Sequence, residues 1–163
     1  MKLKRITIEQ SETVRDLAEQ SRELFVKLGG GEPTKNSVKS MFELLPPDKT
    51  NEDKYSLLIL DKNEPVGFID VVKGFPTEST WFIGLFFLVP KSRGQGKSQT
   101  AYQKLVAFIK ENGGEKIRLT VAEQNLPGLR FWQKNGFEEI EFIPDMKIAG
   151  QSVPSYKMEV DIK

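Results

Sequence analysis

The fold of this chain is decided by three consecutive segments: WFIGLFFLV (residues 81–89), PKSRGQGKS (90–98) and QTAYQKLVAFI (99–109). The first segment is apolar throughout and rich in aromatic residues, which predicts a strand buried on both faces. The third has Ala101, Leu105, Phe108 and Ile109 at helical spacing, which predicts an amphipathic helix packed on that strand. Between them, glycines let backbone N–H groups turn outward beside a helix N-terminus. The three segments therefore predict a phosphate-binding turn.

The composition predicts a single, soluble domain spanning residues 1–163. The chain has 24 basic and 23 acidic residues and a formal charge of +1, so there is no general argument for a nucleic acid or anionic membrane partner. The longest apolar run is too short for a membrane-spanning helix, and no signal-like apolar core follows the N-terminus. We therefore expect a cytoplasmic protein that binds neither nucleic acid nor membrane.

Two residue types are absent, and their absence limits the chemistry. Without Cys there is no thiol nucleophile, and without His the usual neutral-pH base and the commonest transition-metal ligand are both missing. We expect no metal site. Catalysis has to use carboxylates, phenols, hydroxyls, amines, backbone groups or water.

The rest of the chain predicts strands and helices that alternate around residues 81–109. Helices are expected from Ser11 or Thr13 to Leu28, from Asn36 or Ser37 to Leu45, and from Asn125 to Gln133. Strands are expected at 2–8, 55–60, 65–73, 81–89, 117–121, 137–149 and 153–162. Residues 46–54 are interpreted as a mobile surface loop. The order β-α-α-β-β-β-α-β-α-β-β predicts a mixed sheet covered by helices.

Two motifs in this order resemble the GCN5-related N-acetyltransferase (GNAT) superfamily. Residues 93–98, RGQGKS, are similar to the pyrophosphate signature Q/R-x-x-G-x-G/A, with Ser98 in place of the last small residue and Pro90 three residues before the Arg. Residues 125–137, NLPGLRFWQKNGF, are similar to N-x-x-A-x-x-(F/Y)-(Y/W)-x-K-x-G-F, with Gly128 at the Ala position. Together the motifs cover 19 of the 163 residues, and the strand order covers nearly all of the chain.

The resemblance implies an α/β (α+β) fold. Its sheet would be mixed and mostly antiparallel, with six to seven strands, about four flanking helices, and a splay between strands 4 and 5. It also implies acetyl-CoA, or another acyl-CoA, as cofactor. The pyrophosphate would bind the backbone of the glycine turn, and the pantetheine would bind the edge of the fourth strand and Asn125. The residues that these roles implicate are Phe87, Leu88, Val89, Arg93, Gly94, Gln95, Gly96, Lys97, Ser98 and Asn125.

Two other interpretations of the glycine turn stay open from the residues alone. Gly96-Lys97-Ser98 ends like a nucleotide P-loop, but that pattern requires glycine where this chain has Lys91. A basic turn containing glycine is also often an ordinary surface turn. The second motif and the order of elements favour CoA over both alternatives.

The resemblance implies direct attack of an amine on the thioester, but both familiar proton-transfer positions are vacant. Relatives carry a general-acid Tyr where this chain has Trp132, and a general-base Glu near Gly84. The backbone N–H of Leu88 would donate to the thioester carbonyl. The remaining candidates are Asp70, Glu78 and Glu123 as bases and Tyr102 and Tyr156 as acids, with water as an alternative for either role. Each of these side chains also has an ordinary structural explanation, such as packing or solvation.

The sequence thus favours an N-acetyltransferase that transfers an acetyl group from acetyl-CoA to a primary amine of a small molecule, peptide or protein. The alternative is a non-catalytic CoA-binding sensor or scaffold module of the same fold, which the vacant positions at Gly84 and Trp132 would suit. The acceptor is not specified by any residue pattern. A homodimer is a further open alternative.

Overall fold

The computed structural model describes residues 1–148 and 150–163. Its strands are β1 (Lys2–Ile6), β2 (Lys54–Asp61), β3 (Glu64–Lys73), β4 (Thr80–Leu88), β5 (Lys116–Ala122), β6 (Glu138–Ile148) and β7 (Gln151–Asp161). Its α-helices are α1 (Ser11–Gln20), α2 (Arg22–Lys27), α3 (Lys35–Glu43), α4 (Lys97–Glu111) and α5 (Leu126–Lys134). Short 3-10 turns lie at Ile8–Gln10, Asn51–Asp53 and Pro90–Ser92. The predicted order of strands and longer helices is confirmed.

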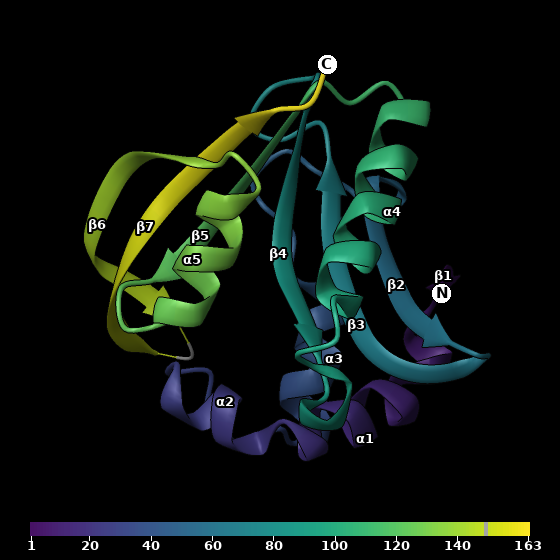
Figure 1. The fold of residues 1–163 in the computed structure, drawn as a ribbon. Coiled ribbons are helices and arrows are strands. Elements are labelled where there is room, and N and C mark those ends of the chain that lie inside the picture. The colour runs from purple at the N-terminus through teal and green to yellow at the C-terminus, as the bar shows by residue number, and fades with distance from the viewer. Residues whose placement is uncertain (149) are drawn as a thin grey trace.

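All seven strands form one mixed sheet in the order β1-β2-β3-β4-β5-β7-β6. Every pair of neighbouring strands is antiparallel except β4 and β5, which are parallel. The β4–β5 pairing runs only from Thr80 and Lys116 to Ile83 and Leu119, although both strands continue beyond it. The two strands therefore separate, and Figure 1 shows them diverging away from the end that carries the C-terminus. This confirms the splay.

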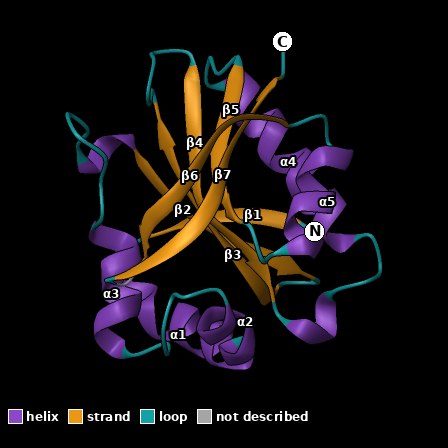
Figure 2. Cartoon of the chain, turned by 90° about the vertical axis from the view of Figure 1, so that its left-hand side faces the viewer, coloured by secondary structure: helices purple, strands orange, loops and turns teal. Residues whose placement is uncertain are grey.

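The sheet lies between two groups of helices. Helices α4 and α5 cover one face, while α3 lies on the other (Figure 2). Aromatic contacts connect each layer to the sheet: Phe108 of α4 packs against Trp81 at 5.9 Å, and Phe42 of α3 packs against Phe68 at 5.7 Å between ring centroids. These rings belong to the hydrophobic core that stabilises both faces of the sheet. No helix in the described residues is both long enough and apolar enough to cross a bilayer.

Several boundaries differ from the sequence predictions. The first strand ends at Ile6 and not at residue 8, because Thr7 caps a 3-10 turn there. The predicted first helix is broken at Ser21, which leaves the helical region with φ −109° and ψ 19° and divides the segment into α1 and α2. Helix α3 starts one to two residues earlier than expected because Thr34 and Ser37 form a capping box. Lys54 belongs to β2 and not to the preceding loop. The expected end of the sixth strand, residue 149, lies outside the described residues.

Candidate active site

The turn between β4 and α4 presents a row of outward-facing backbone amides. Gly94 and Gly96 have φ of 81° and 72°, a conformation that glycine adopts without strain, and the position of a Cβ at either residue has no heavy atom within 4 Å. In the described chain, the first amide after Arg93 with a recorded acceptor is that of Thr100, which donates to the Gly96 carbonyl. The free amides before Thr100 and the helix N-terminus make this turn suitable for an anion.

Two basic side chains of the turn are held by neighbouring elements. Arg93 Nε donates to the Leu88 carbonyl at 2.8 Å, and partial burial lowers the pKa of its guanidinium. Lys97 Nζ lies 2.8 Å from Asp61 Oδ2 at the end of β2, and this contact lowers the pKa of Asp61. The Lys97 side chain is therefore directed toward the hairpin of β2 and β3, and its backbone amide is the group left for a phosphate.

The last residues of β4 have a free edge on the side of the splay. The Val89 amide, just after β4, donates to the Val66 carbonyl of the neighbouring strand β3 at 2.9 Å, so this amide is not available to a ligand. Backbone groups of an antiparallel strand point alternately to its two sides, which directs the Leu88 and Phe86 amides toward the splay and the Phe87 amide toward β3. Of the three strand residues predicted to bind pantetheine through their backbone, Leu88 alone faces the open edge. Phe86, which was not predicted, faces it too.

A carboxylate occupies the space beside Gly84. The register of β3 and β4 passes from Asp70↔Leu85 to Val71↔Ile83, so Gly84 is the extra residue of a β-bulge. A Cβ at Gly84 would lie 2.9 Å from Asp70 Oδ2, whereas the glycine itself is exposed. The predicted vacancy at Gly84 is therefore filled from the neighbouring strand.

Asp70 is paired with a buried lysine. Lys54 Nζ lies 3.1 Å from both carboxylate oxygens and also donates to the Leu44 carbonyl. The side chains of Lys54 and Asp70 are 4% and 13% exposed. Burial raises the pKa of Asp70, and the charge and hydrogen bond of Lys54 act against that increase. The result is a carboxylate that solvent can reach and that is a better base than an ordinary Asp.

The second motif forms α5 and its cap. The Asn125 side chain accepts from the Gly128 amide at 3.1 Å, and a Cβ at Gly128 would collide with this side chain. Gly128 therefore permits the cap. Trp132 is 7% exposed and packs edge-on against Phe86 and Tyr102 at 5.4 and 5.5 Å. This confirms a packing role for Trp132.

The other proton-transfer candidates are less well placed. Glu78 is exposed in the loop before β4, at the end of that strand far from the glycine turn, and Glu123 is also exposed. Tyr102 of α4 is 5% exposed where it packs against the aromatic side chains of α5, and burial raises the pKa of its phenol. Tyr156 of β7 is half-buried, pairs with Val121 of β5, and packs against Phe142 at 5.0 Å. Strand β5 forms the far wall of the splay, and Tyr156 therefore lies on the next strand beyond that wall.

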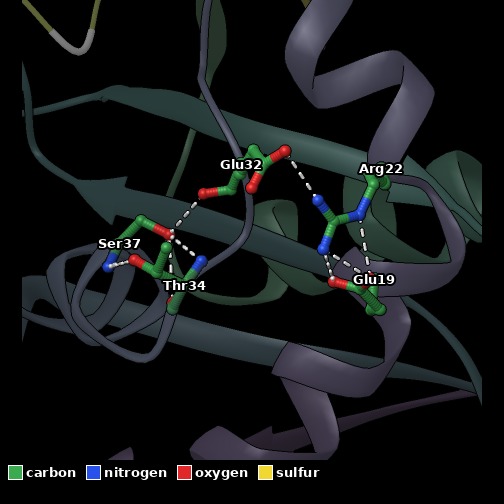
Figure 3. A network of polar contacts seen from close by, with 5 residues as sticks. All are labelled: Glu19, Arg22, Glu32, Thr34 and Ser37. Carbon is green, nitrogen blue, oxygen red and sulfur yellow. Dashed lines mark hydrogen bonds and ion pairs between the residues drawn. The ribbon is translucent and has the colours of Figure 1, made fainter.

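Helix α2 lies between two grooves on the other side of the glycine turn. One, of about 470 Å³, is lined by residues 19–24, Lys27, Pro90 and Arg93, and the other, of about 250 Å³, lies between Lys27 and residues 151–154. Figure 3 shows how α2 is held: Arg22 pairs with Glu19 at 2.6 Å and with Glu32 at 2.8 Å. Gln124 also donates to the Lys27 carbonyl at 2.8 Å. These contacts position α2 across the mouth of the splay.

The Acetyltransferase (GNAT) family matches residues 13–137 of this chain. The chain belongs to the GNAT family. Among curated relatives, the uncharacterized N-acetyltransferase YobR of Bacillus subtilis (strain 168) is 30% identical to this GNAT chain over 120 residues. The aligned region is 71% of this chain and 44% of YobR, so the chain spans less than half of that relative's length.

Solved structures share the fold of this GNAT chain. An acetyltransferase from Thermus thermophilus superposes with a TM-score of 0.76 at 21% identity, covering 98% of this chain and 96% of the other. Spermidine N-acetyltransferase from Vibrio cholerae, in complex with CoA and spermine, gives a TM-score of 0.76 at 14% identity, covering 98% and 94%. The superpositions show that the three proteins share a common fold.

The residues of this GNAT chain fit the CoA that the family uses. The open positions above Gly94 and Gly96 would accommodate a diphosphate, and the two edge amides of Leu88 and Phe86 suit the thioester carbonyl and the amide-bearing pantetheine arm. The sequence did not predict that Phe86 and Lys54 lie at this candidate site. Phe86 has the pattern of a core aromatic residue, and Lys54 follows a polar segment that is typical of a loop. The alternation of Lys54, Ser56 and Leu58 along one strand face was the available signal for Lys54.

Proposed function

We propose that this chain, as a single domain of residues 1–163, transfers an acetyl group from acetyl-CoA directly to a primary amine. The observation that carries the proposal is the position of Asp70: its carboxylate lies at the exposed Gly84 bulge of the strand whose free edge leads to the glycine turn. An anion-binding turn, a pantetheine edge and a proton acceptor contributed by the neighbouring strand β3 thus lie along β4. A CoA sensor would need the first two features but not the third.

Each group has a defined part in the transfer. Acetyl-CoA, when bound, supplies a thioester that an unprotonated amine can attack. The Leu88 amide donates to the carbonyl oxygen, where negative charge develops as the amine attacks. At the exposed position where Gly84 has no side chain, which we call the Gly84 gap, Asp70 Oδ2 would take the proton of the incoming amine, directly or through one water. The leaving sulfur would take a proton from Tyr156 or from water, and holding the reactants together in the splay would lower the barrier further.

The acceptor is proposed to enter from the side of α2. The two grooves that flank this helix contain charged side chains, including Lys27, Glu123 and Arg93, together with apolar surface, which predominates in the larger groove. Such a mixed lining suits an amine of a small molecule or peptide that carries both polar and apolar groups. The fold is shared with an enzyme whose acceptor is spermidine, which agrees with an amine as the acceptor class.

A thiol-release assay with acetyl-CoA and a panel of amines tests the proposed activity. The panel should include polyamines, amino acids, aminoglycosides and peptides with a free N-terminus or lysine. We expect turnover of at least one class, with CoA binding measured separately by calorimetry. CoA binding without turnover on the whole panel would favour the sensor or scaffold function instead.

Replacing Tyr156 by Phe tests its part in the reaction. The variant keeps the ring that packs on Phe142 and removes only the hydroxyl. If Tyr156 is the acid, we expect kcat to fall at least about 100-fold with unchanged CoA affinity, which is the low end of general-acid effects. Tyr55→Phe is a matched control. Tyr55 lies on β2, where it packs against Trp81 and Phe108, away from the proposed site. An unchanged kcat in Tyr156→Phe would assign the proton to water.

A further inference from the structure

The Lys54 side chain extends from β2 toward Asp70 on the neighbouring strand β3 and is nearly fully buried. Its Nζ is 3.1 Å from each Asp70 oxygen, and its other recorded partner is the Leu44 carbonyl, which follows α3. A buried lysine is costly unless it is paired, so this cation has a specific role in the packing around Asp70.

The surroundings of Asp70 make Lys54 the dominant charge at this carboxylate. From β2 the facing side chains are Lys54 and Ser56, from β4 they are Gly84 and Leu85, and the segment after α3 contributes the Leu44 carbonyl. Of these groups Lys54 alone is charged. Without it, burial would favour the protonated carboxyl, which cannot accept a proton.

We propose that Lys54 is a positioning residue for acetyl transfer, whose ammonium orients the Asp70 carboxylate toward the Gly84 gap and keeps it in the ionised, proton-accepting form. The inference rests on the proposed function, because it assigns Lys54 a part through Asp70. The geometry distinguishes the two oxygens by what lies beyond Lys54. Both are 3.1 Å from Lys54 Nζ, but Oδ2 is the oxygen nearest the Cβ position of Gly84, whereas Oδ1 is buried.

The test is the pH dependence of kcat/KM in Lys54→Gln. Glutamine can still donate to Asp70 and to the Leu44 carbonyl but carries no charge. We expect the acid limb of the profile to move up by at least about one pH unit, so that activity is reduced more than tenfold at pH 6 and recovers to within about threefold of wild type at pH 9. Lys54→Met, which removes both charge and donor, should move the limb at least as far. Lys49→Gln is the matched control, because Lys49 pairs with Asp53 outside the site, and it should leave the limb in place.

A second readout does not depend on turnover. The carboxyl carbon of Asp70, followed by carbon-13 NMR against pH, should titrate at higher pH in Lys54→Gln than in wild type, by the same shift as the acid limb. An equal loss of activity at every pH, or an unshifted Asp70 titration, would overturn the proposal and leave Lys54 a structural role. If wild type turns over no amine but the NMR shift is present, the proposed function fails while the control of Asp70 by Lys54 stands.

Discussion

Replacing Gly96 by Asp is expected to weaken CoA binding by at least about 100-fold. Gly96 has φ 72° and precedes the first residue of α4, and the space above it is open. An Asp side chain would place a negative charge where the diphosphate should bind. Two like charges at contact distance near a protein surface repel by up to about 4 kcal/mol, and about 1.4 kcal/mol corresponds to a tenfold change in affinity. Calorimetry with CoA measures the loss directly.

Gly113→Asp controls for the backbone. Gly113 follows the other end of α4, has φ 87°, and likewise has no heavy atom within 4 Å of a Cβ position. The same residue in the same left-handed conformation should cost similar folding stability but leave CoA affinity within about threefold of wild type. If a folded Gly96→Asp variant bound CoA as tightly as wild type, the turn would not be the diphosphate site.

Replacing Asp70 by Asn is expected to lower kcat by about 100-fold or more and to leave CoA affinity unchanged. The amide matches the carboxylate in shape and can still accept from Lys54 but cannot take a proton, and general-base catalysis contributes at least about 100-fold to the rate. Because burial raises the pKa of Asp70, wild-type activity should decrease with falling pH at a value above the 3.8 of an ordinary Asp. Steady-state kinetics across pH measures both effects.

Two further variants distinguish the base from a structural carboxylate. Asp53→Asn makes the same chemical change next to Lys54 in sequence, outside the bulge, and should leave kcat within about threefold of wild type. In Asp70→Ala/Gly84→Glu, the acidic group moves back to β4, and we expect at least about tenfold recovery over Asp70→Ala. Wild-type kcat and an unchanged pH profile in Asp70→Asn would remove Asp70 from the mechanism.

The cofactor side of the site was largely predictable because its recognition is local. Glycines that adopt positive φ, a helix that starts within the same segment and a preceding apolar strand are all contiguous between residues 81 and 109. Asn125 was likewise predictable as a helix cap from its position before Pro127. Which amides of β4 remain free was not predictable, because that depends on the side of the strand that pairs with β3.

The proton acceptor could be shortlisted from the sequence but not selected. Asp70, Glu78 and Glu123 were equally acceptable residue types, and their sequence positions do not say which of them meets the splay. The bulge at Gly84 is the reason that Asp70 is the proposed base, because it places an exposed glycine beside that carboxylate. Lys54 is 16 residues from Asp70 in sequence, so only the register of β2 and β3 brings the two charges together.

The sequence by itself determined the order of strands and helices and the glycine turn, since periodicity and turn chemistry act over a few neighbouring residues. The resemblance of its two motifs to the GNAT family added the class of cofactor. The tertiary structure alone decided that Leu88 and Phe86 face the open edge, that Trp132 packs in the core, and that Asp70 with Lys54 fills the space at Gly84. These outcomes depend on strand pairing and burial between distant segments. No local pattern encodes the bulge register or the desolvation that raises the pKa of Asp70.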